Sequence, residues 1–423
     1  MIAPASGQAR RTAMAETVTC PFCGLACDDL ALSETRLDTR GCARAAAGFA
    51  RAAAPRKPHT VGGKPASRDA AVSAAALILQ GASAPLIHGL AADLHGIRAL
   101  LALAERIGGT VDHMYSPALL ANAAVARASG WVAATFAEVA NRADFILLVG
   151  GDPQRNFPRF HERLVRNATP LYRDGPPKLA YIGPESVAPL ASPAALSAVV
   201  GEAELLNSVA ALSLLTRGRR LGPAHGGLPV DVLAEIAGRL RSARYAVIAW
   251  ELSVRVPLMA ELVVEYLADL LRHLNARTRC VGLPLGGMGN SLGAMQAALW
   301  QLGWPLRVSF ASGGPDHDPW RHDGDRILGA GEADAIVWVA TSVAEPPPVS
   351  AAPMIALVTD DMEPPSPAAV EIRVGTAGVD HGGEIVRADA VIAVPLQAIR
   401  PSDRPSVAQV AREILAAVEE RPC

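Results

Sequence analysis

The sequence predicts an α/β protein built from parallel sheets with helices on both sides. Two kinds of segment lead to this fold class. Short, continuously apolar runs such as ADFILLV (143–149) and ADAIVWV (333–339) are typical of strands buried on both faces of a sheet. Longer segments with apolar residues at helical spacing lie between such runs. Strands that alternate with helices form parallel sheets.

The alternation begins near residue 67 and continues almost to the end of the chain. A Gly/Pro-rich break at 221–229 divides it in two. We expect helices over 70–80, 94–107, 117–128, 158–166, 230–243, 258–275, 291–302 and 406–419. We expect strands over 84–89, 110–114, 143–149, 179–183, 245–250, 280–285, 333–339, 353–358, 370–374 and 388–394.

These elements suggest two Rossmann-like lobes, in which ADFILLVGGDP and ADAIVWVATS are corresponding strands. The predicted division is a disordered tail at 1–14, a cysteine-cluster segment at 15–60, a first α/β lobe at 61–220, a second α/β lobe at 221–365 and a C-terminal mixed β/α segment at 366–423. An alanine-rich helix is expected to begin near Cys42.

Composition excludes several classes of function. The 423 residues carry a net charge of -2, so the chain has no electrostatic footprint for nucleic acid or an anionic membrane surface. The longest charge-free stretch, 281–306, contains prolines, glycines and amides, and we do not expect it to span a membrane. No apolar run follows Arg10-Arg11, which argues against a signal peptide. We expect a cytoplasmic protein.

Four of the six cysteines lie close together in the sequence. Cys20, Cys23 and Cys27 have the spacing C-x2-C-x3-C, and Cys42 follows at a distance. Iron–sulfur clusters use short loops of this kind with a remote fourth thiolate. Zinc is a second interpretation, although zinc ribbons usually show two C-x2-C knuckles. Clustering by chance is a third. We predict a metal site at these four residues.

Two glycine-rich turns are candidates for cofactor binding. Gly150, Gly151 and Asp152 leave a buried strand at its carboxyl end, where ligands bind in open α/β sheets. The second candidate turn contains Gly287, Gly289 and Asn290. A tight turn without a ligand explains either segment equally well.

Other polar groups favour structural interpretations. The 316–323 segment holds two histidines and three aspartates, and we interpret it as a solvated loop. His88, on an apolar strand, is interpreted as a hydrogen-bonded core histidine.

The segments CPFCGLACDDL and RGCARA resemble the N-terminus of the B subunit of formylmethanofuran dehydrogenase, in the molybdopterin oxidoreductase superfamily. The resemblance continues through VDHMYSPALL, LLVGGDPQRNFPRFHER, GLPLGGMGNSLGAMQAALWQLGWPLRVSF and GTAGVDHGGEIVRADAVIAVPL, so it covers most of the chain. It implies a molybdopterin-oxidoreductase-like fold, a [4Fe–4S] cluster on the four cysteines, a bis-pterin molybdenum or tungsten centre and a role in one-carbon metabolism.

The chain departs from this family at one critical segment. The family binds its metal through a cysteine in Cys-His-Gly-Pro, and the matching residues here are Met114-Tyr115-Ser116-Pro117. A thioether is a weak neutral donor compared with a thiolate. We therefore expect that molybdopterin is lost, that the protein is non-redox, and that Met114 and Tyr115 point into a partly filled cavity.

Because Met114 replaces the metal-binding cysteine, the sequence resembles more closely the B subunit of the bacterial formyltransferase/hydrolase complex. That resemblance implies the other subunits of the complex as partners. It also implies a methanofuran-like carrier, which receives a formyl group from tetrahydromethanopterin before hydrolysis to formate. Two alternatives remain: an active catalytic subunit of a molybdenum or tungsten formylmethanofuran dehydrogenase, and a stand-alone iron–sulfur or zinc protein.

Overall fold

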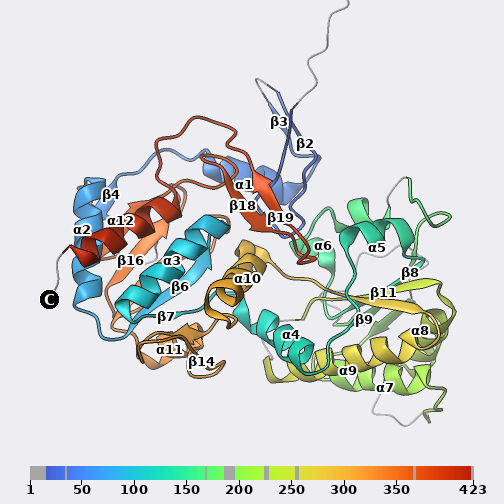
Figure 1. The fold of residues 1–423 in the computed structure, drawn as a ribbon. Coiled ribbons are helices and arrows are strands. Elements are labelled where there is room, and N and C mark those ends of the chain that lie inside the picture. The colour runs from blue at the N-terminus through green and yellow to red at the C-terminus, as the bar shows by residue number, and fades with distance from the viewer. Residues whose placement is uncertain are drawn as a thin grey trace, which may run out of the picture.

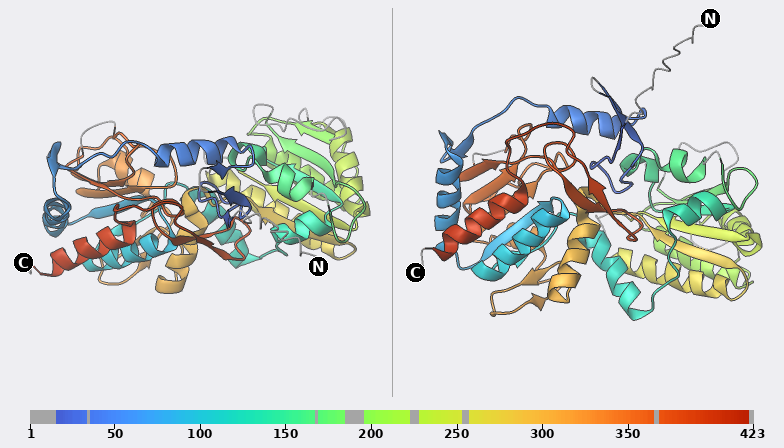
Figure 2. Two further views of the ribbon diagram at one scale, coloured as in Figure 1. Left: turned by 90° about the horizontal axis from the view of Figure 1, so that it is seen from above. Right: turned by 45° about the horizontal axis from the view of Figure 1, so that its top comes forward.

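The computed structural model describes residues 16–33, 36–166, 169–184, 196–222, 228–252, 257–364 and 368–420. The predicted disordered tail at 1–14 and Cys423 lie outside these residues. Two lobes lie side by side, each with its own sheet, and the N-terminal segment lies across their junction (Figures 1 and 2). The predicted mixed α/β class with parallel sheets is confirmed.

One lobe contains a five-stranded sheet in which every neighbouring pair is parallel. Its strand order is β10-β9-β8-β11-β12, and the strands are β8 (Phe145–Val149), β9 (Lys178–Gly183), β10 (Leu196–Val199), β11 (Tyr245–Trp250) and β12 (Arg279–Pro284). The chain builds outward from β8 through β10 and then crosses back to place β11 on the other side of β8. The topological switch point therefore lies between β8 and β11.

The other lobe contains a nine-stranded sheet of order β14-β13-β7-β6-β15-β16-β17-β4-β5. Its central strands are parallel and its edge strands antiparallel. The strands are β4 (His59–Val61), β5 (Lys64–Ala66), β6 (Pro85–Ala91), β7 (Thr110–Val111), β13 (Val308–Ser309), β14 (Asp316–His317), β15 (Ala335–Ala340), β16 (Met354–Val358) and β17 (Val370–Arg373). Here the switch point lies between β6 and β15.

Helices cover both sheets. In the five-stranded lobe, α7 (Leu205–Thr216), α8 (Val230–Ser242) and α9 (Pro257–Asn275) lie on one face, and α5 (Phe136–Arg142) lies on the other (Figure 1). In the nine-stranded lobe, α12 (Val407–Glu419) packs against α2 (Arg68–Gln80) and α3 (Leu94–Ile107). Near the junction, α4 (Ser116–Ala128) packs against α9, and α10 (Ser291–Leu302) packs against α3 and α4.

Smaller elements complete the chain. The cysteine segment contains β1 (Glu16–Val18), β2 (Leu30–Leu32), β3 (Leu37–Asp38) and α1 (Ala43–Ala52), and β1–β3 form an antiparallel sheet. The late hairpin pairs β18 (Gly383–Val386) with β19 (Ala393–Leu396). The remaining helices are α6 (Pro153–Asn156), the π-helix η1 (His161–Val165), the 3-10 helix η3 (Met288–Asn290) and α11 (Gly324–Ala330).

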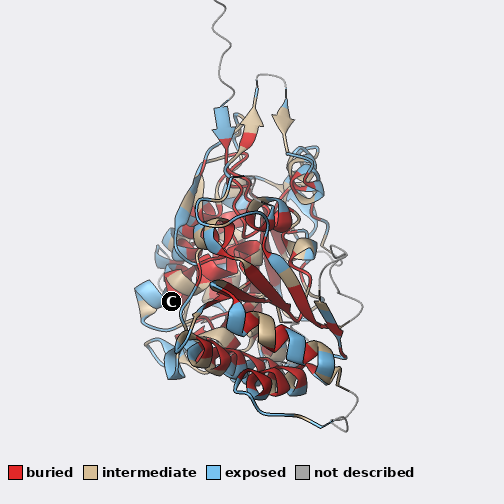
Figure 3. Cartoon of the chain, turned by 90° about the vertical axis from the view of Figure 1, so that its right-hand side faces the viewer, coloured by how far each residue is buried: buried red, intermediate tan, exposed pale blue. Residues whose placement is uncertain are grey.

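The central strands form the core, as their uninterrupted apolar sequences require. Every residue of β6, β8, β15 and β16 is buried, whereas the helices bury one face and expose the other (Figure 3). A strand covered on both faces needs apolar side chains at every position. Uninterrupted apolar sequences therefore identify the central strands of a sheet better than its edge strands.

The order of strands in space differs from the predicted order. Each sheet takes strands from both sides of residue 220, so the lobes are not the consecutive segments 61–220 and 221–365. At each switch point a strand pairs with one that comes later in the sequence: β8 pairs with β11, and β6 pairs with β15. β8 therefore corresponds in position to β6 and not to β15. Such pairings depend on long-range crossovers that local periodicity does not encode.

Several local predictions also need correction. The predicted 388–394 strand is mostly the turn between β18 and β19, and the predicted 110–114 strand ends at Val111. The predicted 158–166 helix is a π-helix confined to 161–165, with α6 just before it. The elements β13, β14, α5, α7 and α11 were not predicted, because short or uniformly apolar segments carry little periodic signal.

Substitution of Gly150 tests the close approach at the β8–β11 switch point. Gly150 has φ +89°, and a Cβ there would lie 2.4 Å from the carbonyl oxygen of Glu251. We expect Gly150→Ala to lower the free energy of unfolding by about 1–3 kcal/mol more than Gly218→Ala does, because an added methyl group overpacks only at Gly150. Gly218 is the matched control, with φ +77° and open space around it. Urea unfolding of both variants measures the difference, and equal losses would show that backbone strain alone matters.

Candidate functional site

A cavity of about 1480 Å³ lies between the two lobes, at the carboxyl ends of strands from both sheets. Gly150, Gly151 and Asp152 follow β8, and Glu251 follows β11, so both sides of that switch point line the cavity. Ser342 lines it two residues beyond β15 of the other sheet. Loops at this edge of a parallel sheet form the usual ligand site of such folds.

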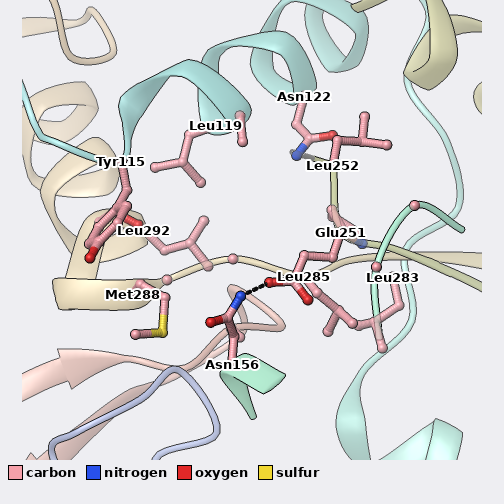
Figure 4. Close-up of a pocket in the computed structure, with 18 of the residues that line it drawn as sticks. Tyr115, Leu119, Asn122, Asn156, Glu251, Leu252, Leu283, Leu285, Met288 and Leu292 are labelled. Atoms are coloured by element: carbon pink, nitrogen blue, oxygen red, sulfur yellow. Dashed lines mark hydrogen bonds between the residues drawn. The ribbon is translucent and has the colours of Figure 1, made fainter. Parts of the chain in front are cut away.

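Three carboxyl groups line the five-stranded side of the cavity, and two of them, Asp152 and Glu251, are shielded from solvent, whereas Glu202 is exposed. Asp152 is buried, and its Oδ1 accepts a hydrogen bond from the backbone N–H of Gln154 at 3.0 Å, which caps α6. The side-chain amide of Asn156 donates to the Glu251 carboxyl group (Figure 4). Burial raises the pKa of Glu251 to about 7; the Asn156 hydrogen bond opposes this rise and the nearby Asp152 charge adds to it. Glu251 is therefore an acid–base group poised near neutral pH.

The opposite wall is largely apolar and comes from α4, α10 and the turn before α10. Leu119, Met288 and Leu292 line this side (Figure 4). Tyr115 lies at its edge and donates its hydroxyl hydrogen to Glu345 Oε1 at 3.1 Å. Burial, together with Glu345, raises the pKa of Tyr115, so its hydroxyl remains protonated.

Three buried polar atoms on the cavity walls have no hydrogen-bond partner among the residues that the structure describes. They are the Oγ atoms of Ser291 and Ser342 and the Nε of Arg44. Ser291 is only 1% exposed and is the first residue of α10, a helix whose N-cap residue makes no side-chain cap bond. Buried polar groups normally find partners. These walls therefore offer hydrogen-bonding capacity to a ligand in the cavity.

Met114 and Tyr115 differ in their placement. Tyr115 lines the cavity as expected, whereas Met114 is not among the lining residues; both side chains pack against the apolar cluster that includes Trp338 and Ala340. The prediction that both side chains point into the cavity is therefore supported for Tyr115 alone, and the cavity of about 1480 Å³ counts against the predicted partial filling. No cysteine is among the described residues that line the cavity.

His113 joins the turn before α4 to the turn before α10. Its Nε2 lies 3.1 Å from the Gly289 carbonyl oxygen, and the Tyr115 backbone N–H donates to its Nδ1 at 3.0 Å. These partners require the neutral ring with hydrogen on Nε2. Complete burial lowers the pKa of His113 to about 3, which agrees with that state.

The structure brings only part of the predicted cofactor set together. Gly287 lines the cavity with Gly150, Gly151 and Asp152, whereas Gly289 and Asn290 are buried outside its lining. The Asn290 amide donates to the Ala92 carbonyl at 2.9 Å and accepts from the Val386 N–H at 2.9 Å. Asn290 therefore holds backbone segments together.

Sequence reasoning missed Glu251, Asn156, Ser291, Ser342 and Arg44. One signal was available for Glu251, which directly follows the buried strand YAVIAW just as GGDP follows ADFILLV. The other four are brought to the cavity by packing between segments that are distant in sequence.

The four clustered cysteines come together beside the cavity. Cys20, Cys23, Cys27 and Cys42 are all buried, all free, and all line one small gap of about 10 Å³. The Cys20 N–H donates to the Cys27 carbonyl at 2.8 Å, which closes the first loop. Cys42 is the N-cap of α1, and its Sγ accepts from the Ala45 N–H at 3.5 Å.

Thiol chemistry at this cluster depends on burial. Burial raises the pKa of Cys23 to about 12 and also raises the pKa of Cys20, so both thiols are protonated unless a metal displaces the protons. Burial likewise raises the pKa of Cys27, with Arg163 and Arg159 opposing it. Among the described residues, no group of three or more His, Cys, Asp or Glu side chains has an arrangement that holds a single metal ion.

The remaining polar candidates have structural partners. His88 is 1% exposed and makes 3.3 Å contacts with the Asp112 carbonyl and the Asp325 carboxylate, which agrees with a hydrogen-bonded core histidine. In the 316–323 segment, His322 contacts Asp316 at 3.1 Å, and Asp323 pairs with Arg307 at 2.6 Å. Cys280 is an isolated, buried residue of β12.

Comparison with known proteins identifies the family. The B subunit of the formyltransferase/hydrolase complex Fhc of Methylorubrum extorquens is 31% identical over 367 residues, covering 85% of this chain and 97% of that protein. The chain belongs to this family. A crystal structure of the FhcABCD complex from the same organism, in complex with methylofuran, contains a chain that matches with a TM-score of 0.74 and 30% identity, over 86% of this chain and 99% of that one.

Two further matches have lower sequence identity. The B subunit of tungsten-containing formylmethanofuran dehydrogenase 2 from Methanocaldococcus jannaschii is 27% identical over 425 residues, covering 94% of this chain and 96% of that protein. Acetylene hydratase from Pelobacter acetylenicus shares the fold, with a TM-score of 0.60 and 11% identity over 96% of this chain and 69% of that one. No family model matches the chain. Within the described residues, no helix is both long and apolar enough to cross a membrane.

Glu251→Gln tests the acid–base character of the cavity. Because the pKa of Glu251 rises to about 7 on folding, its ionisation opposes folding above its usual pKa of 4.5, and this cost reaches its full size above pH 7. We expect Glu251→Gln to raise the free energy of unfolding at pH 8 by about 1–3 kcal/mol and to leave it unchanged near pH 4.5. Urea unfolding at both pH values measures the effect. The exposed Glu105→Gln serves as control, and a gain of the same size at both pH values would contradict the assignment.

The contribution of His113 to the free energy of unfolding should decrease in mild acid. The folded state holds the ring neutral with a pKa near 3, whereas an unfolded histidine titrates near its usual 6.5. The stabilising contribution is complete above pH 6.5 and falls by about 1.4 kcal/mol for each pH unit below it, until the folded pKa is reached. Chemical unfolding from pH 7.5 to 5 should show this loss as the difference between the wild type and His113→Asn, because Glu251 contributes a change of opposite sign over this range in both proteins. Identical slopes would show that His113 is not responsible.

Proposed function

We propose that this chain is the B subunit of a formyltransferase/hydrolase complex and acts there as a scaffold without redox turnover of its own. Two observations support this proposal: the chain belongs to the family, and none of the described residues that line the cavity is a cysteine. The related Fhc protein is part of an assembly that was crystallised with methylofuran. By analogy, this chain would assemble with the other subunits, in the cytoplasm, around a methanofuran-like formyl carrier.

The proposed complex serves one-carbon metabolism from formaldehyde to formate. Its other subunits would move a formyl group from tetrahydromethanopterin to the carrier and then hydrolyse it. The contribution of this chain would be to hold the assembly together. Its large cavity lies between its two lobes. Loss of redox chemistry leaves such a structural role intact, because assembly depends on the fold and not on a metal ligand.

The chain's residues do not fit a molybdenum or tungsten centre. The two lobes and their facing switch points support a molybdopterin-oxidoreductase-like ancestry, as does the fold shared with acetylene hydratase. However, Met114 stands where the family has its metal-binding cysteine, and it is not among the residues that line the cavity. No thiolate donor is therefore available where the metal would need one.

The grouping of the four cysteines supports the proposal of an iron–sulfur group. Four buried, unpaired thiols line one gap, and Arg159 lines the same gap. Thiolate-ligated clusters carry negative charge, which nearby guanidinium groups stabilise. We propose that Cys20, Cys23, Cys27 and Cys42 hold a [4Fe–4S] cluster. The cluster would either transfer single electrons or cross-link the N-terminal segment through its four ligands.

A working dehydrogenase is the second candidate. The tungsten-containing archaeal relative matches along 94% of this chain, and the cavity is large enough for a sizeable ligand. This alternative requires a metal ligand other than Met114. Pterin extraction from the purified protein and a dye-linked formyl-oxidation assay distinguish the two functions, and two negative results would remove the dehydrogenase.

Metal analysis of the affinity-purified native complex tests the proposed function. We expect partner subunits to co-purify with the tagged chain, and molybdenum and tungsten to be far below one atom per chain. Iron should be close to about four atoms per chain after anaerobic purification. In a Cys20→Ala/Cys23→Ala variant, iron should fall while the partners remain bound. Stoichiometric molybdenum or tungsten would overturn the scaffold proposal, and absence of partners would overturn membership in the complex.

A further inference from the structure

Two acidic side chains meet on the five-stranded wall of the cavity. Asp152 follows β8 and Glu251 follows β11, so both carboxyl groups lie at the same switch point. A Cβ placed on Gly151 would lie 3.6 Å from Glu251 Oε2, which puts this oxygen beside the residue that precedes Asp152. We call Asp152 and Glu251 the acid pair.

The acid pair is hydrogen-bonded but has no cationic partner. Asp152 Oδ1 accepts a hydrogen bond from the Gln154 N–H at 3.0 Å, and Glu251 Oε1 accepts one from the side-chain amide of Asn156 (Figure 4). Within the part of the chain that the structure describes, neither carboxyl group forms an ion pair. Carboxylates that are shielded from water are normally paired with a cation. The acid pair can therefore accept a positively charged group.

The charged groups around the acid pair are of both signs. Arg44 of α1 lowers the pKa of Glu251 through its charge, and its Nη2 donates to the Arg155 carbonyl oxygen at 3.2 Å. Arg155 lines the cavity from α6, and the exposed Glu202 adds a carboxyl group to the same wall. Burial and the Asp152 charge nevertheless raise the pKa of Glu251 to about 7. A proton thus cancels the Glu251 charge up to neutral pH, and an ammonium group can take the place of that proton.

Apolar side chains complete the surroundings of the acid pair. Leu283 and Leu285 lie on the Glu251 side of the cavity (Figure 4). Leu119 of α4 and Leu292 of α10 form part of the opposite wall. Sites for small molecules usually combine such apolar walls with a few convergent polar groups. The cavity therefore suits a charged group on an apolar body.

A second polar group points to a ligand from the α10 side. Ser291 begins α10, is only 1% exposed and lines the cavity, and its Oγ has no hydrogen-bond partner among the described residues. The side chain of the N-cap residue, Asn290, does not cap the helix. A hydroxyl group at the positive end of a helix dipole complements an oxygen acceptor.

We propose that this cavity binds a small organic amine that also carries an oxygen atom. The ammonium group lies between Asp152 and Glu251, and the proton that it displaces goes to solvent. The apolar body lies against Leu119 and Leu292, and the oxygen accepts a hydrogen bond from Ser291. Hydrogen bonds between ions are stronger than neutral ones, so the acid pair selects for the amine. This binding role goes beyond the scaffold function and does not depend on it.

Isothermal titration calorimetry of the full chain with tyramine tests the site. Tyrosol is the matched probe, because it has a neutral hydroxyl group in place of the amine. We expect tyramine to bind roughly tenfold more tightly at pH 8 than at pH 6, because Glu251, with a pKa of about 7, is mostly ionised only at the higher pH. Tyrosol should bind at least about tenfold more weakly than tyramine at pH 8 and show no such pH dependence.

Four variants separate the contributions to binding. Glu251→Gln should weaken tyramine binding at pH 8 by roughly tenfold and remove its pH dependence. Asp152→Asn, which retains a good N-cap residue, should weaken binding and move the midpoint of the pH dependence below 7, because the Asp152 charge raises the pKa of Glu251. Ser291→Ala should weaken binding by about two- to tenfold. Glu202→Gln is the matched control, since it removes an exposed carboxyl group from the same wall, and it should match the wild type. Circular dichroism checks that each variant is folded.

Several results would overturn the proposal. They are absence of tyramine binding to the wild type at millimolar concentration, equal affinity for tyramine and tyrosol, and an unchanged pH dependence in Glu251→Gln. An equal loss in Glu202→Gln would show that the charge of the whole cavity matters and that the acid pair is not the amine site. If Glu251→Gln does not fold, an unchanged pH midpoint in Asp152→Asn overturns the acid pair.

The purified complex provides the last test. If the isolated chain binds tyramine and the complex with its partner subunits also binds it, a small amine is the occupant. If only the isolated chain binds it, a side chain of a partner subunit occupies the acid pair, and the small-molecule proposal is overturned. The scaffold function stands in each of these cases, because it is tested by co-purification and metal content.

Discussion

Parallel strand order is the constraint on which the rest of this structure depends. In a parallel sheet every strand ends at the same edge, so the loops that can bind a ligand collect there. This protein has one all-parallel sheet and one whose central strands are parallel, and the loops that follow β8, β11 and β15 line one space. The cavity, the acid pair on one wall and the unpartnered serines on the walls all follow from this opposition of two loop edges.

The β8–β11 switch point shows how closely the backbone must approach to build the wall. Gly150 adopts a left-handed conformation, and its α-carbon lies where a side chain would collide with the Glu251 carbonyl. This approach places Asp152 and Glu251 on neighbouring strand ends, and burial then raises the pKa of Glu251 toward neutrality.

One continuous segment joins the cavity to the cysteine cluster. Gly150, Gly151, Asp152, Arg155 and Asn156 line the cavity, and Arg159, farther along the same segment, lines the gap at the cysteines. A movement of this segment would therefore act on both sites.

Local sequence patterns determined the fold class, the central strands and the grouping of the cysteines. Runs such as ADFILLV specify burial on both faces wherever they lie, and C-x2-C-x3-C spacing brings thiols together within one loop. The same patterns failed at the elements that have little local signal: the edge strands, the turn at 388–394 and the π-helix after α6.

Only the tertiary structure decided which strands share a sheet and which residues share a cavity. β6 pairs with β15 across more than 240 residues. The side-chain amide of Asn290, a residue of the predicted cofactor set, makes hydrogen bonds with the backbone of Ala92 and Val386 instead of lining the cavity. Glu251, Ser291 and Ser342 meet at one cavity for the same reason. The physical cause is that periodicity along a chain encodes which face of an element is buried, whereas the partner of that face is chosen by packing between distant segments.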